Sequence, residues 1–173
     1  DYFRGIASEP ARIKLFSNIV DVDDFQRNSA KGSGVHKPFV LLIGSFGHKN
    51  SPMDRAAQWL INDIMPLVCR QVDGAHLCIV GRNADKTLAE YKSDFVTVVG
   101  MVPSMLPFLQ DARASLVPLH FESGTRFKIL ESGAASVPCV STTLGAEGLN
   151  VEDGKDIIIA DTTEEFAEAI VKM

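Results

Sequence analysis

From Pro38 onward the sequence alternates between continuous apolar runs and segments with helical periodicity, and this alternation limits the possible folds. The apolar runs FVLLIGS, AHLCIVG and DFVTVVG each contain a glycine at or near their end, and RASLVPLH, PCVST and DIIIA follow them. Runs that are apolar at nearly every position suit strands buried on both faces, because a half-exposed strand would alternate with polar residues. About six such strands separated by helices predict a doubly wound parallel sheet, an α/β domain of the Rossmann-like type.

The segments between the runs carry the signals of helix ends. In SPMDRAAQWLINDIMPLVCRQV, apolar residues recur every four positions from Ala56 to Val68, behind a Ser-Pro pair that suits a cap and a first helical position. Shorter helices are expected in NADKTLAEYK, in TRFKILESGAAS, and in SMLPFLQDA, where Pro107 would interrupt the helix. TTEEFAEAIVKM predicts a closing helix capped by Thr162 or Thr163.

Residues 1–37 do not follow this alternation and are expected to form a connection. RIKLFSNIVDVDDFQR has one short apolar run, and NSAKGSGVHKP is polar and contains Gly and Ser, as flexible linkers do. We therefore predict a linker or domain edge over residues 1–37 and a single Rossmann-like domain over residues 38–173. Because the chain begins at Asp1, we expect it to be part of a longer protein.

Composition and charge narrow the classes of partner. The net charge of −5 argues against a nucleic-acid partner, because phosphate backbones need a basic surface. Three cysteines without a CxxC pair favour a reducing, cytoplasmic compartment. No apolar run approaches the roughly 20 residues that span a bilayer. We expect no metal site, because the histidines lack ligand spacing; His120 and Glu122 sharing a metal is the minor alternative.

The stretch HFESGTRFKILESGAASVPCVST carries most of the recognisable chemistry. It follows the fourth apolar run, so Ser123, Gly124 and Thr125 should lie at the carboxyl edge of the sheet, where such folds bind ligands. The unpaired amides of the first helical turn would attract an anion, and Arg126 and Lys128 add positive charge nearby. This combination predicts a diphosphate site.

Glu131 extends this predicted site along the same helix. It lies eight residues after Ser123, which is roughly 12 Å at 1.5 Å per helical residue. Its side chain leans back toward the start of the helix, which shortens that distance. A carboxylate there could accept hydrogen bonds from the two hydroxyls of a ribose while the phosphates lie at the helix start. Phosphate and ribose sites on one helix indicate a nucleotide.

The same residues also permit a purely structural interpretation. Phe127, Leu130 and Ala134 fall at i, i+3 and i+7 and would form a core stripe, with Lys128 and Glu131 as an exposed ion pair. The residues alone leave both interpretations open. A dinucleotide-dependent oxidoreductase is disfavoured, because GSFGHKN has glycines but no complete GxGxxG fingerprint.

Several stretches together resemble, in the same order, the carboxyl-terminal domain of glycosyltransferase family 4, one of the two Rossmann-like halves of a GT-B enzyme. They are LLIGSFGHKNSPMDRAAQWLINDIMPLV, LCIVG, FVTVVGMV, ASLVPL, GTRFKILESGAASVPCVSTTLGAEGL and EEFAEAIVKM, and RIKLFSNIVDVDDF is similar to the segment that joins the halves. The resemblance implies retaining transfer of a sugar from a nucleotide-diphosphate-sugar donor, with no metal or other cofactor required. The saccharide or lipid-linked acceptor would be bound by a missing amino-terminal domain, without which the fragment would be inactive. The parent enzyme would work in the cytoplasm and could associate peripherally with the inner face of the membrane.

The resemblance also implies roles for individual residues. Glu131 matches the second glutamate of a paired-glutamate motif that is associated with the donor ribose. The position of the first glutamate is occupied by Ser123, so its role has moved to the neighbouring Glu122 or is lost. The catalytic candidates are therefore Glu122 and Lys128. The donor contacts implied are Gly47, Arg82, Met101, Val102, Ser123, Gly124, Thr125, Arg126 and Glu131, with Met101 and Val102 at the nucleobase.

Two features limit this assignment. Many members of the family place an Arg and a Lys after the first strand, whereas GSFGHKN supplies Lys49 but no arginine. A non-enzymatic α/β domain that binds a nucleotide or a partner protein for regulation is the alternative function. Such a protein would lack a second Rossmann-like half upstream of Asp1, so the upstream sequence would distinguish the two.

Overall fold

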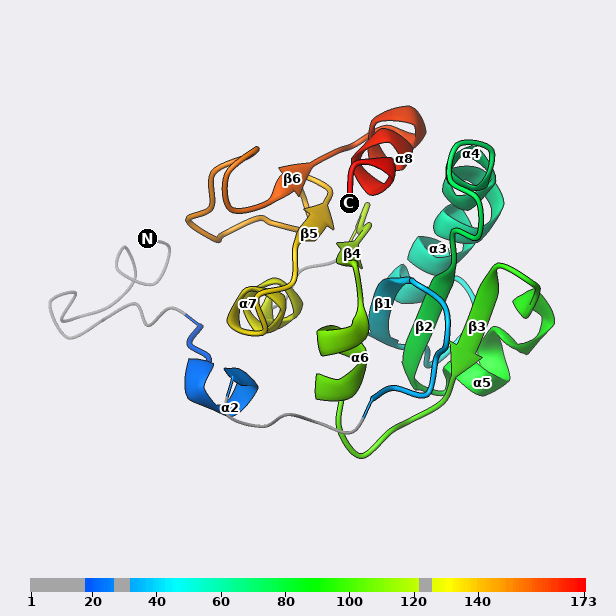
Figure 1. Cartoon of the computed structure of the whole chain (residues 1–173), viewed down its shortest axis with the longest axis horizontal. Coiled ribbons are helices and arrows are strands. Elements are labelled where there is room, and N and C mark those ends of the chain that lie inside the picture. The colour runs from blue at the N-terminus through cyan, green and yellow to red at the C-terminus, as the bar shows by residue number, and fades with distance from the viewer. Residues whose placement is uncertain (1–17, 27–31, 122–125) are drawn as a thin grey trace, which may run out of the picture.

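Six parallel strands form a single sheet in the computed structural model, which describes residues 18–26, 32–121 and 126–173 (Figure 1). The sheet has the strand order β3-β2-β1-β4-β5-β6, and every neighbouring pair is parallel. The order changes direction between β1 and β4, which is the switch point of a doubly wound fold. The predicted fold class is therefore confirmed. The strands are β1 (Val40–Ser45), β2 (Leu77–Arg82), β3 (Val96–Val99), β4 (Ala114–Val117), β5 (Cys139–Ser141) and β6 (Ile158–Ile159).

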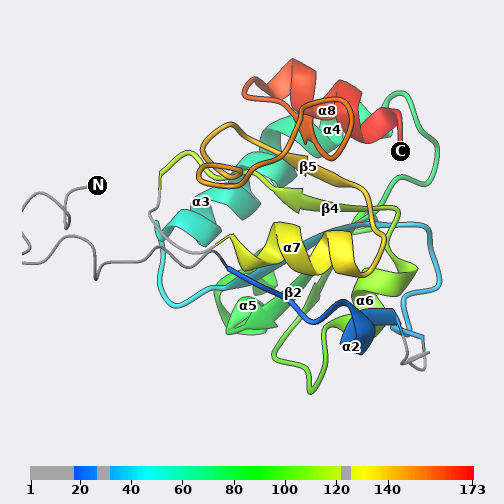
Figure 2. The ribbon, with the colours of Figure 1, turned by 90° about the vertical axis from the view of Figure 1, so that its left-hand side faces the viewer.

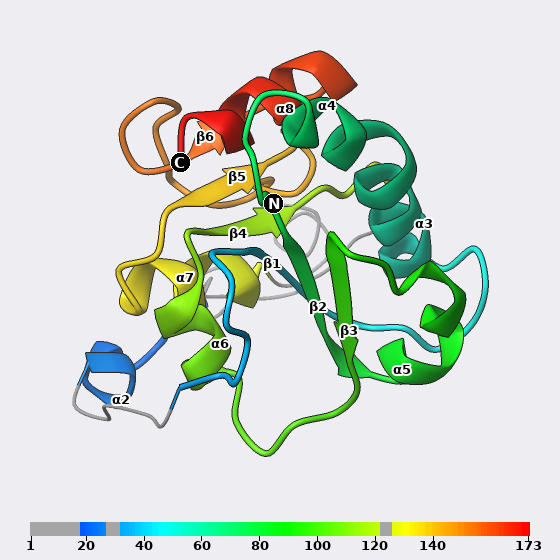
Figure 3. The same ribbon diagram turned by 45° about the vertical axis from the view of Figure 1, so that its right-hand side comes forward.

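Helices cover both faces of this sheet, as Figure 3 shows. On one face lie α3 (Pro52–Trp59), η2 (Leu60–Ile64), α4 (Met65–Cys69), α5 (Ala84–Thr87), η3 (Ala89–Tyr91) and α8 (Thr163–Val171). On the other lie α6 (Leu106–Asp111) and α7 (Phe127–Ala134). The short helix α2 (Val22–Gln26) lies against α7 on that second face (Figure 2).

Each face of the sheet has its own apolar cluster. The larger cluster, under α3, α4 and α8, includes Leu42, Ile79 and Phe166, all with no exposed surface. The smaller cluster, on the side of α6, includes Phe39 and Leu41. Successive residues of a strand point to opposite faces, which is why Leu41 and Leu42 belong to different clusters. Burial on both faces explains why the strand sequences are apolar at nearly every position.

The two strand cysteines belong to this interior. Cys78 and Cys139 are buried, Cys69 is half-buried, and all three are free thiols. Burial raises the pKa of the Cys78 and Cys139 thiols to about 12. Both therefore stay protonated and act as small apolar side chains.

The predicted helix caps are largely confirmed. The Ser51 hydroxyl accepts the Asp54 amide at 3.3 Å at the start of α3. Thr162 begins α8 with a reciprocal capping box, in which it accepts the Glu165 amide and Glu165 accepts the Thr162 amide. The prediction that Pro107 interrupts a helix is wrong. Pro107 lies in the first turn of α6, where an amide would have no helical acceptor, so the ring fits without disrupting the helix.

The segments α3, η2 and α4 form one long helix with a π-helical portion in the middle. Within η2 the amide of Met65 donates to the carbonyl of Leu60, five residues back. Pro66 follows immediately, and in a regular α-helix its ring would clash with the carbonyl of Asn62, four residues earlier. The wider π-helical turn accommodates this proline. Asn62 and Asp63, within this turn, are both exposed.

Part of the predicted linker packs on the domain beside α6. The carbonyl of Phe25 accepts a hydrogen bond from the Gln110 side chain at 3.3 Å, and the Phe25 ring packs against the smaller cluster. The amide of Ser33 donates to Asp111 at 2.7 Å.

In the part of the chain that the structure describes, none of the helices has the length and hydropathy of a membrane span.

Candidate functional site

The carboxyl ends of the strands bring several predicted site residues to one edge of the sheet. Gly47 follows β1, Arg82 is the last residue of β2, and Met101 and Val102 follow β3. Ser45 and Arg82 are paired in the register of β1 and β2, so these strand ends are adjacent. Met101 is 76% exposed, and Arg82 is exposed as well. Residues far apart in sequence thus share the edge at which doubly wound folds bind ligands.

Four predicted residues fall in a segment about which the structure gives no description. Residues 122–125, between β4 and α7, lie outside the described residues. They are Glu122, Ser123, Gly124 and Thr125.

The next helix, α7, begins at Phe127. Arg126 takes the cap position of α7, without a side-chain cap of the kind a Ser or Thr would give. The amides of Ile129 and Leu130 donate to the Arg126 carbonyl at 3.1 and 3.4 Å. The amides before them lack acceptors inside a helix, and they carry the positive end of its dipole.

Lys128 reaches from α7 across the switch point. Its Nζ lies 3.7 Å from Sδ of Met53, which belongs to the first turn of α3. The Met53 side chain in turn covers Gly44 near the end of β1, where an added Cβ would lie 2.5 Å from Met53 Cε. The Lys128 ammonium is therefore placed between the helices that follow β1 and β4. A cation at this position can contact an anion bound at the switch point.

Glu131 lies one turn further along α7 and is half-buried. Burial raises the pKa of its carboxyl group, and the positive charge of Lys128 opposes this effect to a smaller extent. An ionised carboxylate offers acceptors only, so hydroxyl groups are suitable partners for it. The purely structural interpretation of this helix expects Lys128 and Glu131 to form an exposed ion pair. Glu131 is half-buried, so it does not fit that expectation.

The predicted core stripe of α7 is wrong at its first member. Phe127 is 40% exposed, and the helix buries Ile129 and Ser132 together with the predicted Ala134. The buried Ser132 hydroxyl is accommodated because it donates to the Lys128 carbonyl at 2.7 Å. Phe127 is thereby left as an exposed aromatic ring at the start of α7.

Arg126 is the least accessible of the predicted cationic contacts. It is 6% exposed, and its Nη2 lies 3.7 Å from Oε2 of Glu147, whose own side chain is 68% exposed. A buried guanidinium is retained only when it is paired, and this pair joins the start of α7 to the loop after β5. Arg126 is thus a buried, paired cation, whereas Arg82 presents its charge at the surface.

The loop after β5 packs beneath the same edge. The Gly145 amide donates to the Thr142 hydroxyl at 3.0 Å, and that hydroxyl donates to the carbonyl of Leu119. Gly145 and Ala146 are buried, whereas Glu147 is exposed. The loop therefore fixes the end of β4, from which the segment leading to α7 departs.

Sequence reasoning missed one residue that orders this edge, Asp54. Its side chain is 1% exposed, and Oδ2 accepts the Asn50 amide and the Gln58 side-chain amide. These bonds hold the turn between β1 and α3, in which Gly47 has no atom within 4 Å of an added Cβ. The signal was present in the sequence, because an acid three residues after the cap Ser51 is typical of a helix start.

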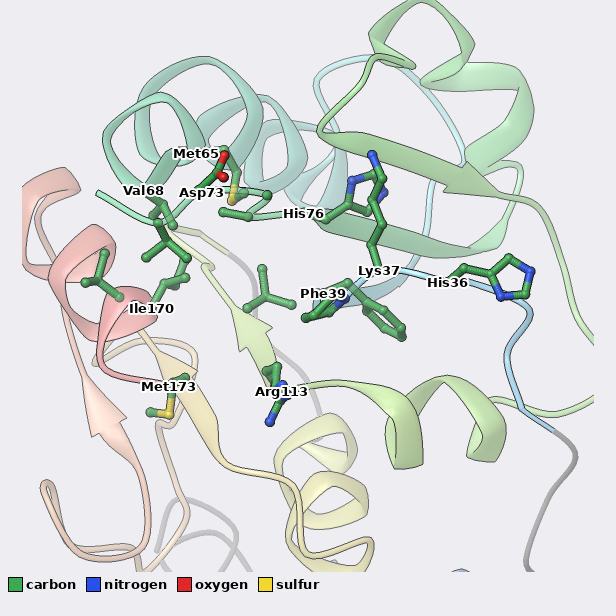
Figure 4. Close-up of a pocket in the computed structure, with 16 residues that line it drawn as sticks. His36, Lys37, Phe39, Met65, Val68, Asp73, His76, Arg113, Ile170 and Met173 are labelled. Carbon is green, nitrogen blue, oxygen red and sulfur yellow. The ribbon is translucent and has the colours of Figure 1, made fainter. Parts of the chain in front are cut away.

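A cavity of about 400 Å³ lies at the opposite edge, where β1, β2 and β4 begin (Figure 4). Lys37 and Arg113 stand beside it, but the walls are mainly apolar. His36, Asp73 and His76 also line it, and because the Asp73 carboxylate stands among these groups we assign no anionic ligand to this cavity. Its apolar lining includes Phe39, Met65, Val68, Ile170 and Met173.

In the described ranges 18–26, 32–121 and 126–173, no group of three or more His, Cys, Asp or Glu side chains is arranged to hold a metal ion.

Residues 37–173 match the family model described as "Glycosyl transferases group 1". A curated relative, an uncharacterized 44.6 kDa protein in the cps region of Klebsiella pneumoniae, is 23% identical over 147 residues. This alignment covers 79% of the present chain and 37% of the relative, so the chain spans well under half of that protein.

Several solved structures share this fold. Anabaena HepE in complex with UDP and glucose has a TM-score of 0.60 and 11% identity, covering 79% of this chain and 38% of that one. WaaG, which acts in lipopolysaccharide biosynthesis, has a TM-score of 0.57 and 16% identity, covering 90% and 42%. The pneumococcal O-GlcNAc transferase GtfA, in complex with UDP and GlcNAc, has a TM-score of 0.55 and 13% identity, covering 78% and 27%. At such identities these likenesses show a shared fold, and the family match over residues 37–173 shows that the chain belongs to the group 1 glycosyltransferases.

Proposed function

We propose that this chain is the carboxyl-terminal, donor-binding domain of a family 4 glycosyltransferase. The whole enzyme would transfer a sugar from a nucleotide-diphosphate-sugar to a saccharide or lipid-linked acceptor, with retention of anomeric configuration. The family match supports this proposal, and so do similar structures described in complex with UDP and a sugar. The acceptor would be bound by a further domain, so the isolated chain is expected to bind nucleotide without transferring sugar.

One observation carries the proposal: Lys128 spans from α7 to the first turn of α3 at the switch point, with Glu131 one turn behind it. The diphosphate would lie between Lys128, the early amides of α7 and the open turn at Gly47. Glu131 would then accept the ribose hydroxyls. The nucleobase would lie toward the residues that follow β3, Met101 and Val102.

The proposed chemistry is stabilisation of the departing nucleoside diphosphate. Negative charge develops on this group as the sugar leaves, and oriented amides and cations lower the barrier most when they are aimed at that charge. Lys128 and Arg82 would supply the cations, so the proposed transfer requires no metal. Glu122 is the proposed contact to the donor sugar in the place of the first family glutamate.

Isothermal titration with UDP, GDP and ADP tests the donor site. The wild-type chain should bind at least one of them at millimolar concentration or below. Lys128→Ala should weaken that binding by about 1–3 kcal/mol, because it removes a charge-assisted contact to phosphate. Glu131→Ala should weaken it by a similar amount through the loss of the ribose contact. Lys172→Ala is the matched control, because Lys172 is an exposed cation after α8, remote from this edge.

Two results would count against the proposal. One is the absence of binding to all three nucleotides by a chain whose circular dichroism shows the expected fold. The other is Lys128→Ala binding as tightly as the Lys172→Ala control.

A further inference from the structure

A separate cavity of about 470 Å³ lies along the outer side of α3, and we call it the α3 cavity. One end is formed by Asn50, in the turn after β1, so it begins close to the carboxyl edge of the sheet. One wall comes from α3 and η2. The other comes from His120 and Phe121, which follow β4. The proposed donor function uses none of these side chains.

The wall from α3 and η2 is polar. Arg55, Gln58, Asn62 and Asp63 line it, at spacings that put them on one side of a helix. The π-helical turn of η2 carries both Asn62 and Asp63 into this wall. π-helical turns are rare and occur frequently at functional sites.

These polar groups are largely available to a ligand. Within the described residues, the side chains of Asn62 and Asp63 make no hydrogen bond or ion pair, and both are exposed. The amide nitrogen of Gln58 is used by Asp54 at 3.0 Å, and its carbonyl oxygen makes no bond to a described residue. The wall therefore offers an amide, a carboxylate and a carbonyl close together.

The aromatic lining of the cavity combines Trp59, the last residue of α3, with the wall formed by His120 and Phe121. The indole nitrogen of Trp59 donates to the Thr163 hydroxyl at 3.0 Å, which fixes the ring against the start of α8. The His120 ring meets Trp59 edge to face, with centroids 4.2 Å apart. Phe121 is 42% exposed, with the Arg55 guanidinium 5.3 Å from the centre of its ring. An exposed apolar surface thus faces the polar wall of α3.

This pairing of surfaces suits a sugar ring. A pyranose has a face of C–H groups, whose partial positive charge is attracted to the negative face of an aromatic ring. Its rim of hydroxyls can donate to and accept from planar amide, carboxylate and guanidinium groups in pairs. Arg55 and Asp63 carry opposite charges, so the cavity favours a neutral ligand over a phosphate. A volume of about 470 Å³ lies within the range of small-molecule sites.

We propose that the α3 cavity binds a neutral saccharide unit, at a site distinct from the donor edge. This binding goes beyond the proposed donor function, and it can be tested without any assay of transfer. In an enzyme that transfers sugars, the site would hold part of a glycan acceptor or product near the edge where transfer occurs.

Trp59 makes the test specific, because it is the single tryptophan of the chain. Its indole N–H gives one NMR signal that reports on the α3 cavity. Maltotriose and tri-N-acetylchitotriose are titrated separately to about 10 mM into the whole 173-residue chain. At least one of them should shift this signal in a saturable manner.

The double variant Asn62→Ala, Asp63→Ala should weaken the saturable response roughly tenfold or more, since two hydroxyl partners are lost. Both side chains are exposed, so the fold should be retained. Asp73→Ala is the matched control, an exposed acid outside this cavity, and should leave the response unchanged. The absence of a saturable shift with both sugars would overturn the proposal, and so would a response that survives the double variant.

A parallel titration of the same samples with UDP, GDP and ADP separates the two proposals. Nucleotide binding with no response to either sugar overturns the saccharide site alone. A response to sugar in the absence of nucleotide binding overturns the donor site and leaves the saccharide site supported.

Discussion

Replacing Gly81 by alanine should destabilise the chain far more than the loss of one hydrogen atom suggests. Gly81 pairs with Gly44 in the register of β1 and β2, near the carboxyl ends of two inner strands, and its φ is 146°. An added Cβ would lie 1.8 Å from the Gly44 carbonyl oxygen, whereas real Cβ contacts are essentially never shorter than 3.0 Å. The difference between these values requires a displacement of 1.2 Å in a backbone that both faces of the sheet confine.

Two costs add in this variant. A side chain in a sparsely populated positive-φ region costs roughly 1–3 kcal/mol, and shifting a carbonyl within the β1–β2 ladder weakens hydrogen bonds worth about 1 kcal/mol each. We therefore expect Gly81→Ala to lower the free energy of unfolding by roughly 3 kcal/mol or more. Gly154→Ala is the matched control. Its φ is 75° and nothing lies within 4 Å of an added Cβ, so only the first cost applies.

Urea unfolding followed by circular dichroism measures both variants against the wild type, with midpoints compared at a common slope. The expected order of stability is wild type, then Gly154→Ala, then Gly81→Ala. If the two variants are equally stable, the close approach of β1 and β2 at Gly81 has no energetic consequence and the reasoning is refuted.

Two further predictions concern the helices. Burial raises the pKa of Glu131 above its ordinary value of 4.5. In the pH range between the ordinary pKa and the raised pKa of the folded state, the folded state therefore binds more protons than the unfolded state. Ionised Glu131 thus opposes folding near pH 7, and Glu131→Gln should be more stable than wild type there, with the gain shrinking toward about pH 4; a gain independent of pH contradicts this cause. Thr162→Ala should lower stability by about 0.5–2 kcal/mol through loss of the α8 cap, and Thr162→Ser should restore most of it; equal stability of the two variants would exclude the cap as the reason.

The strands were predictable because their pattern has a single physical cause. A strand covered on both faces must be apolar on both, so the run from Val40 to Ile43 could be recognised without knowing its neighbours. The caps at Ser51 and Thr162 were predictable for a similar reason, since a helix start needs a local acceptor within a few residues.

The errors arose where a local pattern allows two outcomes. A proline inside a helical pattern either breaks the helix or lies in its first turn. For Pro107 the outcome depends on the residue at which α6 begins after β3. Phe127 fits a core stripe by spacing, but the packing of α7 on β4 and β5 buries Ile129 and Ser132 instead. The π-helical turn before Pro66 likewise has two causes. The proline cannot fit a regular α-helical turn, and the helix nevertheless continues through it from α3 to α4.

By itself, the sequence determined the class of fold and the edge of the sheet at which several candidate residues lie, because apolar runs, closing glycines and helix caps are properties of short segments. Tertiary structure decided which side chains meet at that edge. Lys128 and Met53 are far apart in sequence, as are Trp59 and His120, and each pair meets only because the sheet places β1 beside β4. Such contacts depend on strand order and on the burial of each helix face, which no short segment specifies.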